Sequence, residues 1–251
     1  SYDPKEYNLD HVNAGKTLFD LYKLTGKEKY RRAMDTVYSQ LKEQPRTSTG
    51  NFWHKKIYPH QIWLDGLYMA QPFYMQYEAE YNGCKNCEDS YQQFLQVYDR
   101  MRDPLNGLYY HAYDDSRQMF WCDKVTGLSE NFWLRAMGWY AMALIDTMEV
   151  MPESMACQKA RLNAIYKELI DAMLPYQDQA TGMWYQVVNR GGIAPNYLEE
   201  SGSAIFAYAI MKSVRLHYLP EEYFKYGQKA FDGICSTYLS EKDGSLQLGG
   251  I

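Results

Sequence analysis

The apolar residues of this chain recur mostly with the period of an α-helix. One example is Val12–Thr25 (VNAGKTLFDLYKLT), where Ala14, Leu18, Leu21 and Tyr22 are expected on one buried face. The same periodicity predicts seven further helices, at Lys27–Glu43, Gln61–Glu80, Glu88–Arg102, Asn131–Met151, Ser154–Leu174, Ser201–Tyr218 and Glu221–Leu239. Two passages have strand character instead: Leu108–Cys122, which we expect to form a short hairpin, and Met183–Asn189. Helix pairs without a β–α–β rhythm predict an all-α fold.

Three loops share a glycine, a spacer, two aromatic residues and a polar ring or amide. They are GNFWH (50–54), GLYYH (107–111) and GMWYQ (182–186). Each precedes a helix whose head reads aromatic, leucine, charged, and a fainter head, NLD, precedes the first helix. The charged positions of these four heads are Asp10, Asp65, Arg135 and Glu199. Repeated helical hairpins stack on one another because a single hairpin cannot bury its own apolar face.

Stacking in register would bring these charged residues to one rim, together with His54, His111 and Gln186 of the preceding loops. Taken alone, Asp65 reads as a helix N-terminal cap, a common place for an acid. Unrelated caps would scatter over the surface, whereas titratable groups that converge indicate a functional site. Four hairpins do not close a ring, since six would need roughly 350 residues. We therefore expect an open array, or part of a longer barrel.

Composition narrows the function. Aromatic residues make up 16% of the 251 residues, and their rings can be core or can form platforms on which sugars stack. A net charge of −5 without a basic run excludes a nucleic-acid partner. No apolar run reaches ~18 residues, so no membrane span is expected. The histidines lack acid or cysteine partners at ligand spacing, which predicts no metal site and no cofactor.

The five cysteines are scattered and odd in number, which is not the pattern of a disulfide framework. Cys84 and Cys87 form a lone C-x-x-C, for which redox or zinc use is the weaker interpretation. This cysteine usage favours a reducing compartment, so we expect a cytoplasmic protein, with the periplasm as the alternative.

Five stretches of the chain resemble, in order, the unsaturated rhamnogalacturonyl hydrolases of glycoside hydrolase family 105. They are FWHK (52–55), YPHQIWLDGLYMAQPF (58–73), GLYYHAYDD (107–115), FWLRAMGWYAMAL (132–144) and NYLEESGSAIFAYAI (196–210). The resemblance implies an (α/α)6 barrel and a pectin-degrading enzyme. That enzyme removes the Δ4,5-unsaturated galacturonate that a lyase leaves at the non-reducing end of rhamnogalacturonan. It also implies one barrel domain over residues 1–251 that lacks the family's first and closing segments.

The resemblance also assigns roles to individual residues. Asp65 falls on the general acid/base and Asp10 on its carboxylate companion. The substrate-contacting positions are His54, Trp63, His111, Trp133 and Arg135. In the implied reaction C4 of the sugar is protonated, water adds at C5, and the hemiketal opens and expels the aglycone. We expect partial burial beside Asp10 and the tryptophans to keep Asp65 protonated for this step.

Each assignment has a structural alternative. Arg135 suits the substrate carboxylate, but a salt bridge to Glu130 or another rim acid is the alternative. Trp63 and Trp133 stack on sugars or belong to the core. Lys55 and Lys56 are read as solvated surface.

Two other functions stay open for the whole chain. One is a glucuronyl hydrolase or conventional inverting glycosidase on the same barrel, in which Asp65 and Asp10 divide the acid and base roles. The other is a non-catalytic helical scaffold that binds sugar or protein.

Overall fold

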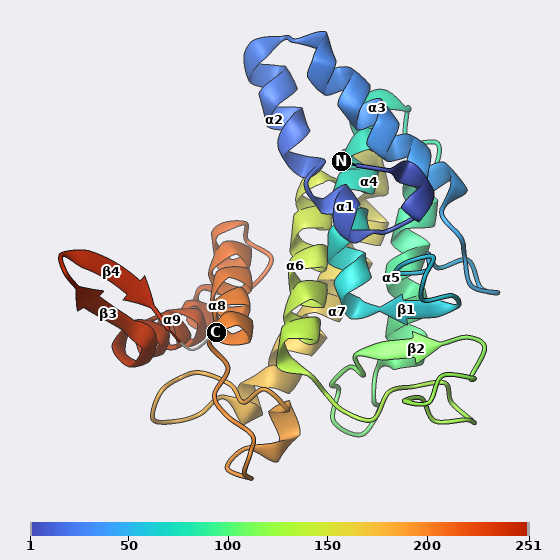
Figure 1. The fold of residues 1–251 in the computed structure, drawn as a ribbon. Helices are drawn as coiled ribbons and strands as arrows, with labels where there is room; N and C mark the ends of the chain where they lie inside the picture. Colours follow the sequence, from blue (N-terminus) through green and yellow to red (C-terminus); the bar gives the residue numbers. More distant parts are fainter. Residues whose placement is uncertain (1, 250–251) are drawn as a thin grey trace.

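Helices form most of residues 2–249, the part of the chain that the computed structural model describes (Figure 1). The helices are α1 (Asp10–Asn13), α2 (Lys16–Thr25), α3 (Glu28–Glu43), α4 (Leu64–Tyr81), α5 (Cys87–Met101), α6 (Leu134–Val150), α7 (Ala156–Met173), α8 (Glu200–Arg215) and α9 (Phe224–Tyr238). The four short strands are β1 (Gln61–Trp63), β2 (Ala112–Asp114), β3 (Leu239–Lys242) and β4 (Ser245–Leu248). The all-α prediction is confirmed.

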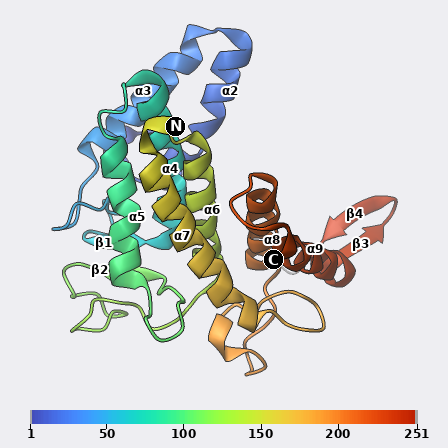
Figure 2. The same cartoon turned by 180° about the vertical axis from the view of Figure 1, so that it is seen from behind.

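The helices form two rows. In the inner row, α6 packs against α4 on one side and α8 on the other, as Figure 1 shows. In the view from behind, α5 and α7 lie in front of α4 and α6 and form an outer row (Figure 2). The core between the rows contains fully buried aromatic side chains, among them Phe94 of α5, Tyr140 of α6 and Tyr166 of α7. The N-terminal ends of the inner helices face the loops that carry the repeated motif.

The first predicted helix, Val12–Thr25, is not continuous in the structure. The helix is interrupted between α1 and α2. Gly15 lies in this interruption, and a Cβ there would be 2.9 Å from the ring of Phe73. Of the four residues expected on the buried face, Leu18 and Tyr22 pack against the core, whereas Ala14 and Leu21 are exposed. The fully packed positions are Val12 and Phe19, so the buried face differs from the one that the periodicity predicts.

The extended passages also pair differently from the prediction. Leu108–Cys122 does not form a hairpin of its own, because β2 pairs antiparallel with β1 of the previous repeat loop. Met183–Asn189 forms no regular strand and makes only isolated bridges, one from Val187 to Trp133. The last helix ends at Tyr238, and β3 and β4 form a hairpin that the helical pattern did not predict.

Cys84 and Cys87 are joined by a disulfide in the turn between α4 and α5. The sequence reading did not predict this bond, which weakens the composition argument for a reducing compartment. Cys122, Cys157 and Cys235 are free thiols. Among residues 2–249 no helix combines the length and apolar character needed to cross a bilayer.

Candidate active site

One hydrogen bond recurs at the heads of the first three repeats. In each, the leucine N–H before the charged residue donates to the carbonyl of the polar residue that ends the next loop. The pairs are Leu9 with His54 (3.1 Å), Leu64 with His111 (3.1 Å) and Leu134 with Gln186 (2.8 Å). The register that the repeat predicts is thus present in the structure. It sets Asp10 beside His54 and Asp65 beside His111, from residues more than 40 positions apart.

Asp65 lies in the first turn of α4, but it is not the cap. The N-cap position is occupied by Trp63, and no side chain caps the helix there. The Asp65 carboxylate contacts a ring nitrogen instead, with Oδ2 lying 3.1 Å from Nε2 of His111. The pairing of Trp63 with Ala112 across β1 and β2 holds the two side chains together. The capping alternative therefore does not describe the contact that Asp65 makes.

The structure contradicts the expectation that burial keeps Asp65 protonated. Burial does raise the pKa of Asp65, but the hydrogen bond with His111 and the proximity of the His111 and His54 rings outweigh it and leave that pKa below its usual value. The lowered pKa makes Asp65 an ionised carboxylate at neutral pH, and a ring nitrogen of His111 lies within hydrogen-bond distance of it. The position of Asp65 in the sequence could not reveal its charge state, because the direction of its pKa shift depends on which side chains lie next to the carboxylate.

Asp10 forms the second acid–histidine pair. Its Oδ1 lies 3.4 Å from Nε2 of His54, and its Oδ2 lies 2.6 Å from Nζ of Lys55. His54 is almost completely buried, and desolvation lowers its pKa to about 4 despite the nearby carboxylates of Asp10 and Asp65. Lys55 was read as solvated surface, but the structure places its ammonium group in an ion pair with a candidate catalytic acid.

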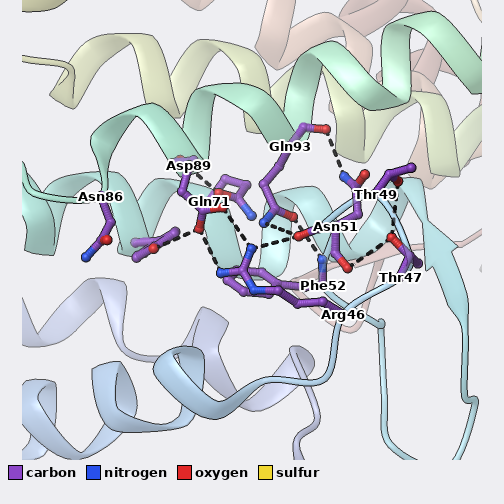
Figure 3. Close-up of polar contacts among 12 residues, drawn as sticks. Arg46, Thr47, Thr49, Asn51, Phe52, Gln71, Asn86, Asp89 and Gln93 are labelled. Carbon is purple, nitrogen blue, oxygen red and sulfur yellow. Dashed lines mark hydrogen bonds and ion pairs between the residues drawn. The ribbon is translucent and has the colours of Figure 1, made fainter.

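The loop that carries His54 is fixed to α5 by buried polar contacts, which Figure 3 shows. The side-chain amide of Asn51 donates to the carbonyl of Gln93 (3.1 Å), and the N–H of Phe52 donates to Oε1 of the same residue (3.0 Å). Arg46 binds both carboxylate oxygens of Asp89 at 2.7 and 2.8 Å. Such satisfied networks rigidify a loop, so His54 projects from a fixed backbone.

Trp63 lies between the two histidines. Its ring stacks on His54 with centroids 4.6 Å apart and on Tyr58 at 5.1 Å, and it lies 5.4 Å from the ring of His111. On its other side, His111 meets Trp133 edge-on at 4.9 Å. Both tryptophans are partly exposed and line a cavity, and Trp133 also packs against the hydrophobic core.

Arg135 contacts an acid, as its structural alternative allowed. Its Nη1 lies 3.2 Å from Oε1 of Glu199, the charged residue of the next repeat head, and also donates to Oγ of Ser201 (3.2 Å). Ser201 donates in turn to Glu199 at 2.9 Å. Burial raises the pKa of Glu199, and the contacts with Ser201 and Arg135 only partly oppose this. The guanidinium lies over the ring of Trp133, 4.5 Å from its centroid.

A cavity of about 820 Å³ opens beside these groups. One wall carries Trp63, His111 and Trp133, and Gln186 of the third repeat loop also faces it. The remaining wall comes from the segment after β2, which includes Phe120, Trp121, Cys122, Asp123, Ser129, Glu130 and Asn131. This segment lies outside the repeat motif, so the repeat gave no signal for it. The sequence pattern likewise does not assign Glu199 and Ser201 to the site, although Glu199 is the fourth charged position of the repeat heads.

Within residues 2–249 no group of three or more histidine, cysteine or acidic side chains is arranged to hold a metal ion. The sequence named seven site residues, and six are linked by contacts that run through His54, Trp63, His111 and Trp133. The seventh, Arg135, joins through Trp133.

Comparison with known proteins decides the family. The sequence profile of Glycosyl Hydrolase Family 88 matches residues 2–251. The chain belongs to this family. It is therefore a glycoside hydrolase, and the resemblance to unsaturated rhamnogalacturonyl hydrolases is confirmed.

Individual relatives agree with this membership. Unsaturated rhamnogalacturonyl hydrolase YesR of Bacillus subtilis is 30% identical over 248 residues, which cover 95% of this chain and 65% of YesR. Protein Atu3128 of Agrobacterium fabrum is 36% identical over 188 residues, covering 73% of this chain and 79% of that protein.

Solved structures extend the likeness to the fold. A family 105 glycoside hydrolase of Clostridium acetobutylicum has a TM-score of 0.94 and 46% identity, covering 98% of this chain and 69% of the other. An unsaturated glucuronyl hydrolase of Bacillus sp. GL1 shares the fold with a TM-score of 0.72 at 16% identity, over 94% of this chain and 65% of the other. The helical array described above is thus the (α/α)-barrel architecture of these enzymes.

Proposed function

We propose that this glycoside hydrolase removes a Δ4,5-unsaturated galacturonyl residue from the non-reducing end of rhamnogalacturonan fragments, with rhamnose as the leaving sugar. The observation that carries the proposal is the Asp65–His111 pair beside a cavity walled by Trp63 and Trp133. The likeness to YesR over 95% of the chain supports this choice of substrate.

The reaction needs one proton and one water. The substrate is an enol ether whose C4=C5 bond is conjugated to a carboxylate. Its π electrons take a proton at C4, which leaves a cation at C5 that the ring oxygen shares. Water adds to C5 and gives up a proton to the group that donated the first one. The hemiketal then opens to a ketone at C5, and the hemiacetal left at C1 releases the rhamnose. The whole sequence consumes one water.

Asp65 is the proposed proton donor, although its neighbours hold its pKa below the usual value. Binding an anionic substrate adds a second negative charge and displaces water, and both effects raise the pKa of a carboxyl. With its pKa raised, Asp65 takes up a proton from the solvent and passes it to C4, while the His111 ring nitrogen 3.1 Å from Oδ2 holds the carboxyl group in place. After transfer, Asp65 is again ionised and accepts the proton of the attacking water.

Arg135 and Asp10 have supporting roles in this proposal. One nitrogen of Arg135 is engaged by Glu199 and Ser201, so its other N–H groups can form hydrogen bonds with the substrate carboxylate. Asp10, held by Lys55, presents a fixed carboxylate to the sugar hydroxyls. Trp63 and Trp133 offer ring faces to the apolar side of the sugar.

The test is a comparison of two substrates. The protein is incubated with unsaturated galacturonyl-rhamnose and with its saturated counterpart, and both loss of ultraviolet absorbance and release of rhamnose are followed. We expect turnover of the unsaturated substrate only. Equal release of rhamnose from the saturated compound would indicate a conventional glycosidase, and turnover of neither would contradict the proposal.

A further inference from the structure

Two adjacent aromatic side chains in the segment between β2 and α6 face the cavity. Phe120 is 91% exposed and Trp121 is half-buried, and both line the cavity together with Trp63 and Trp133. A phenylalanine in this setting leaves nearly its whole ring in water, where apolar surface is unfavourable by roughly 25 cal/mol per Å². The ring lines the cavity and lies outside the buried core clusters, so it is free to contact what enters the cavity.

The backbone that carries Phe120 is fixed before any ligand arrives. The fully buried carboxylate of Asp114 accepts hydrogen bonds from the N–H groups of Ser116 (3.1 Å), Gln118 (2.8 Å) and Met119 (2.9 Å). The hydroxyl of Ser116 donates to the same carboxylate at 2.8 Å. A platform whose backbone is ordered in advance loses little entropy when a ligand binds.

The place of Phe120 determines which part of the substrate it meets. The reacting sugar must sit against His111 and Asp65, at the wall that Trp63 and Trp133 form. A cavity of about 820 Å³ holds more than one sugar ring, since pockets for whole drug-sized ligands span a similar range. The wall formed by Phe120 is therefore available to the sugar that leaves.

We propose that Phe120, with Trp121, is the specificity determinant for the leaving sugar and selects a 6-deoxy sugar over its 6-hydroxy counterpart. This inference rests on the proposed function. A methyl group at C6 that contacts the phenyl ring leaves water, which is favourable for an apolar group. A hydroxyl there loses its hydrogen bonds to water, and the ring returns none. Glu130 and Asn131, which line the same wall, remain available for the other hydroxyl groups.

The experiment uses three substrates that share the unsaturated galacturonyl group. In the three substrates this galacturonyl group is linked to L-rhamnose, to L-mannose (which is rhamnose with a hydroxyl on C6) or to methanol. The proteins are the wild type, Phe120→Ala and Val125→Ala. Val125 is a matched control, because it is 78% exposed in the same segment and does not line the cavity. The kcat and KM are measured from the loss of ultraviolet absorbance, and thermal unfolding checks that each variant is folded.

We expect the wild type to prefer the rhamnosyl over the mannosyl substrate by about 10-fold in kcat/KM, the usual effect of one small group in an apolar pocket. Phe120→Ala should remove most of this preference through KM and leave the methyl glycoside unchanged, while Val125→Ala keeps it. If the wild type and Phe120→Ala have the same preference between the rhamnosyl and mannosyl substrates, the inference is wrong but the proposed function still stands. An equal loss on the methyl glycoside overturns the inference as well. A wild type that turns over none of the three overturns the proposed function and the inference with it.

Discussion

Two acid–histidine pairs on either side of Trp63 come from the same place in successive repeats, yet they are buried in opposite ways. In the Asp10–His54 pair the histidine side chain is 3% exposed and the acid 39%. In the Asp65–His111 pair the acid side chain is the more enclosed, at 17% against 25% for the histidine. Repetition of a motif thus fixes which residues meet, and burial then decides what each of them can do.

The consequence is a division of roles. Desolvation keeps His54 neutral at pH 7, because its pKa falls to about 4. Asp65, by contrast, keeps its charge through His111, which lines the cavity. A neutral buried ring suits packing against Trp63, whereas an ionised acid with a partly exposed proton donor suits proton transfer. We therefore propose that the Asp65–His111 pair carries out the chemistry and that the Asp10–His54 pair has a positioning role.

The largest effect expected from this division is on turnover. Asp65→Asn should lower kcat at least about 100-fold, because it removes a general acid/base. Asp10→Asn is the matched change in the other pair, and it should cost about 10-fold or less, because its ion pair with Lys55 is partly solvated. Both variants are assayed by loss of the ultraviolet absorbance of the unsaturated sugar, with circular dichroism as the check on folding. Equal losses in the two variants would refute the division of roles.

Much of the fold and of this site follows from pattern alone. Helical periodicity locates the principal helices, and the recurring heads bring Asp10, Asp65 and Arg135 together because repeated hairpins stack in register. The physical reason is one backbone hydrogen bond, which the head leucines of the first three repeats (Leu9, Leu64 and Leu134) each donate to the next loop. A repeated sequence therefore carries long-range information that a single motif does not.

What the pattern misses depends on contacts between elements. Gly15 lies so close to the ring of Phe73 that a Cβ there would be 2.9 Å away, and periodicity does not contain this contact. The partner of β2 is β1 rather than a neighbour in sequence. The charge state of Asp65 follows from the position of His111 relative to its carboxylate, and Lys55 is drawn to Asp10 by a contact between two repeats. Phe120 is outside every repeat.

A smaller effect is expected on stability as the pH falls. The pKa of His54 is about 4 in the folded chain and 6.5 in the unfolded chain, so the unfolded state binds the proton more readily. The stability contributed by the neutral ring is complete above pH 6.5 and is lost as the pH falls toward 4. By pH 5 the loss amounts to about 2 kcal/mol. Urea unfolding at pH 7.5 and 5 measures it.

The control separates His54 from the other groups that titrate in this range. His54→Gln should lose less stability than the wild type between the two pH values, by that same amount. His217→Gln, which replaces an exposed histidine beyond α8, should keep the wild-type dependence. If His54→Gln and wild type lose stability in parallel, His54 is not held neutral, and the contrast between the two pairs disappears.

The smallest expected effect comes from Gly66, whose missing side chain makes room for His54. A Cβ there would lie 2.9 Å from Nδ1 of His54 and 3.2 Å from Cδ1 of Leu9, so both neighbours must shift. Gly66→Ala gains about 1 kcal/mol of helix propensity within α4. Overpacking against a ring held by Trp63 costs about 1–3 kcal/mol, so a net loss of about 1 kcal/mol is expected.

A double-mutant cycle shows whether this loss arises at the buried pair. In a His54→Ala background the clash with Gly66→Ala is relieved, so the second substitution should become neutral or stabilising. Urea unfolding of the four proteins at pH 7.5 gives the coupling energy. Additive effects would mean that the glycine is needed for the helix rather than for the histidine. A coupling of about 1 kcal/mol would mean that the chain makes room, one residue after the catalytic acid, for the neutral ring that holds Trp63 in place.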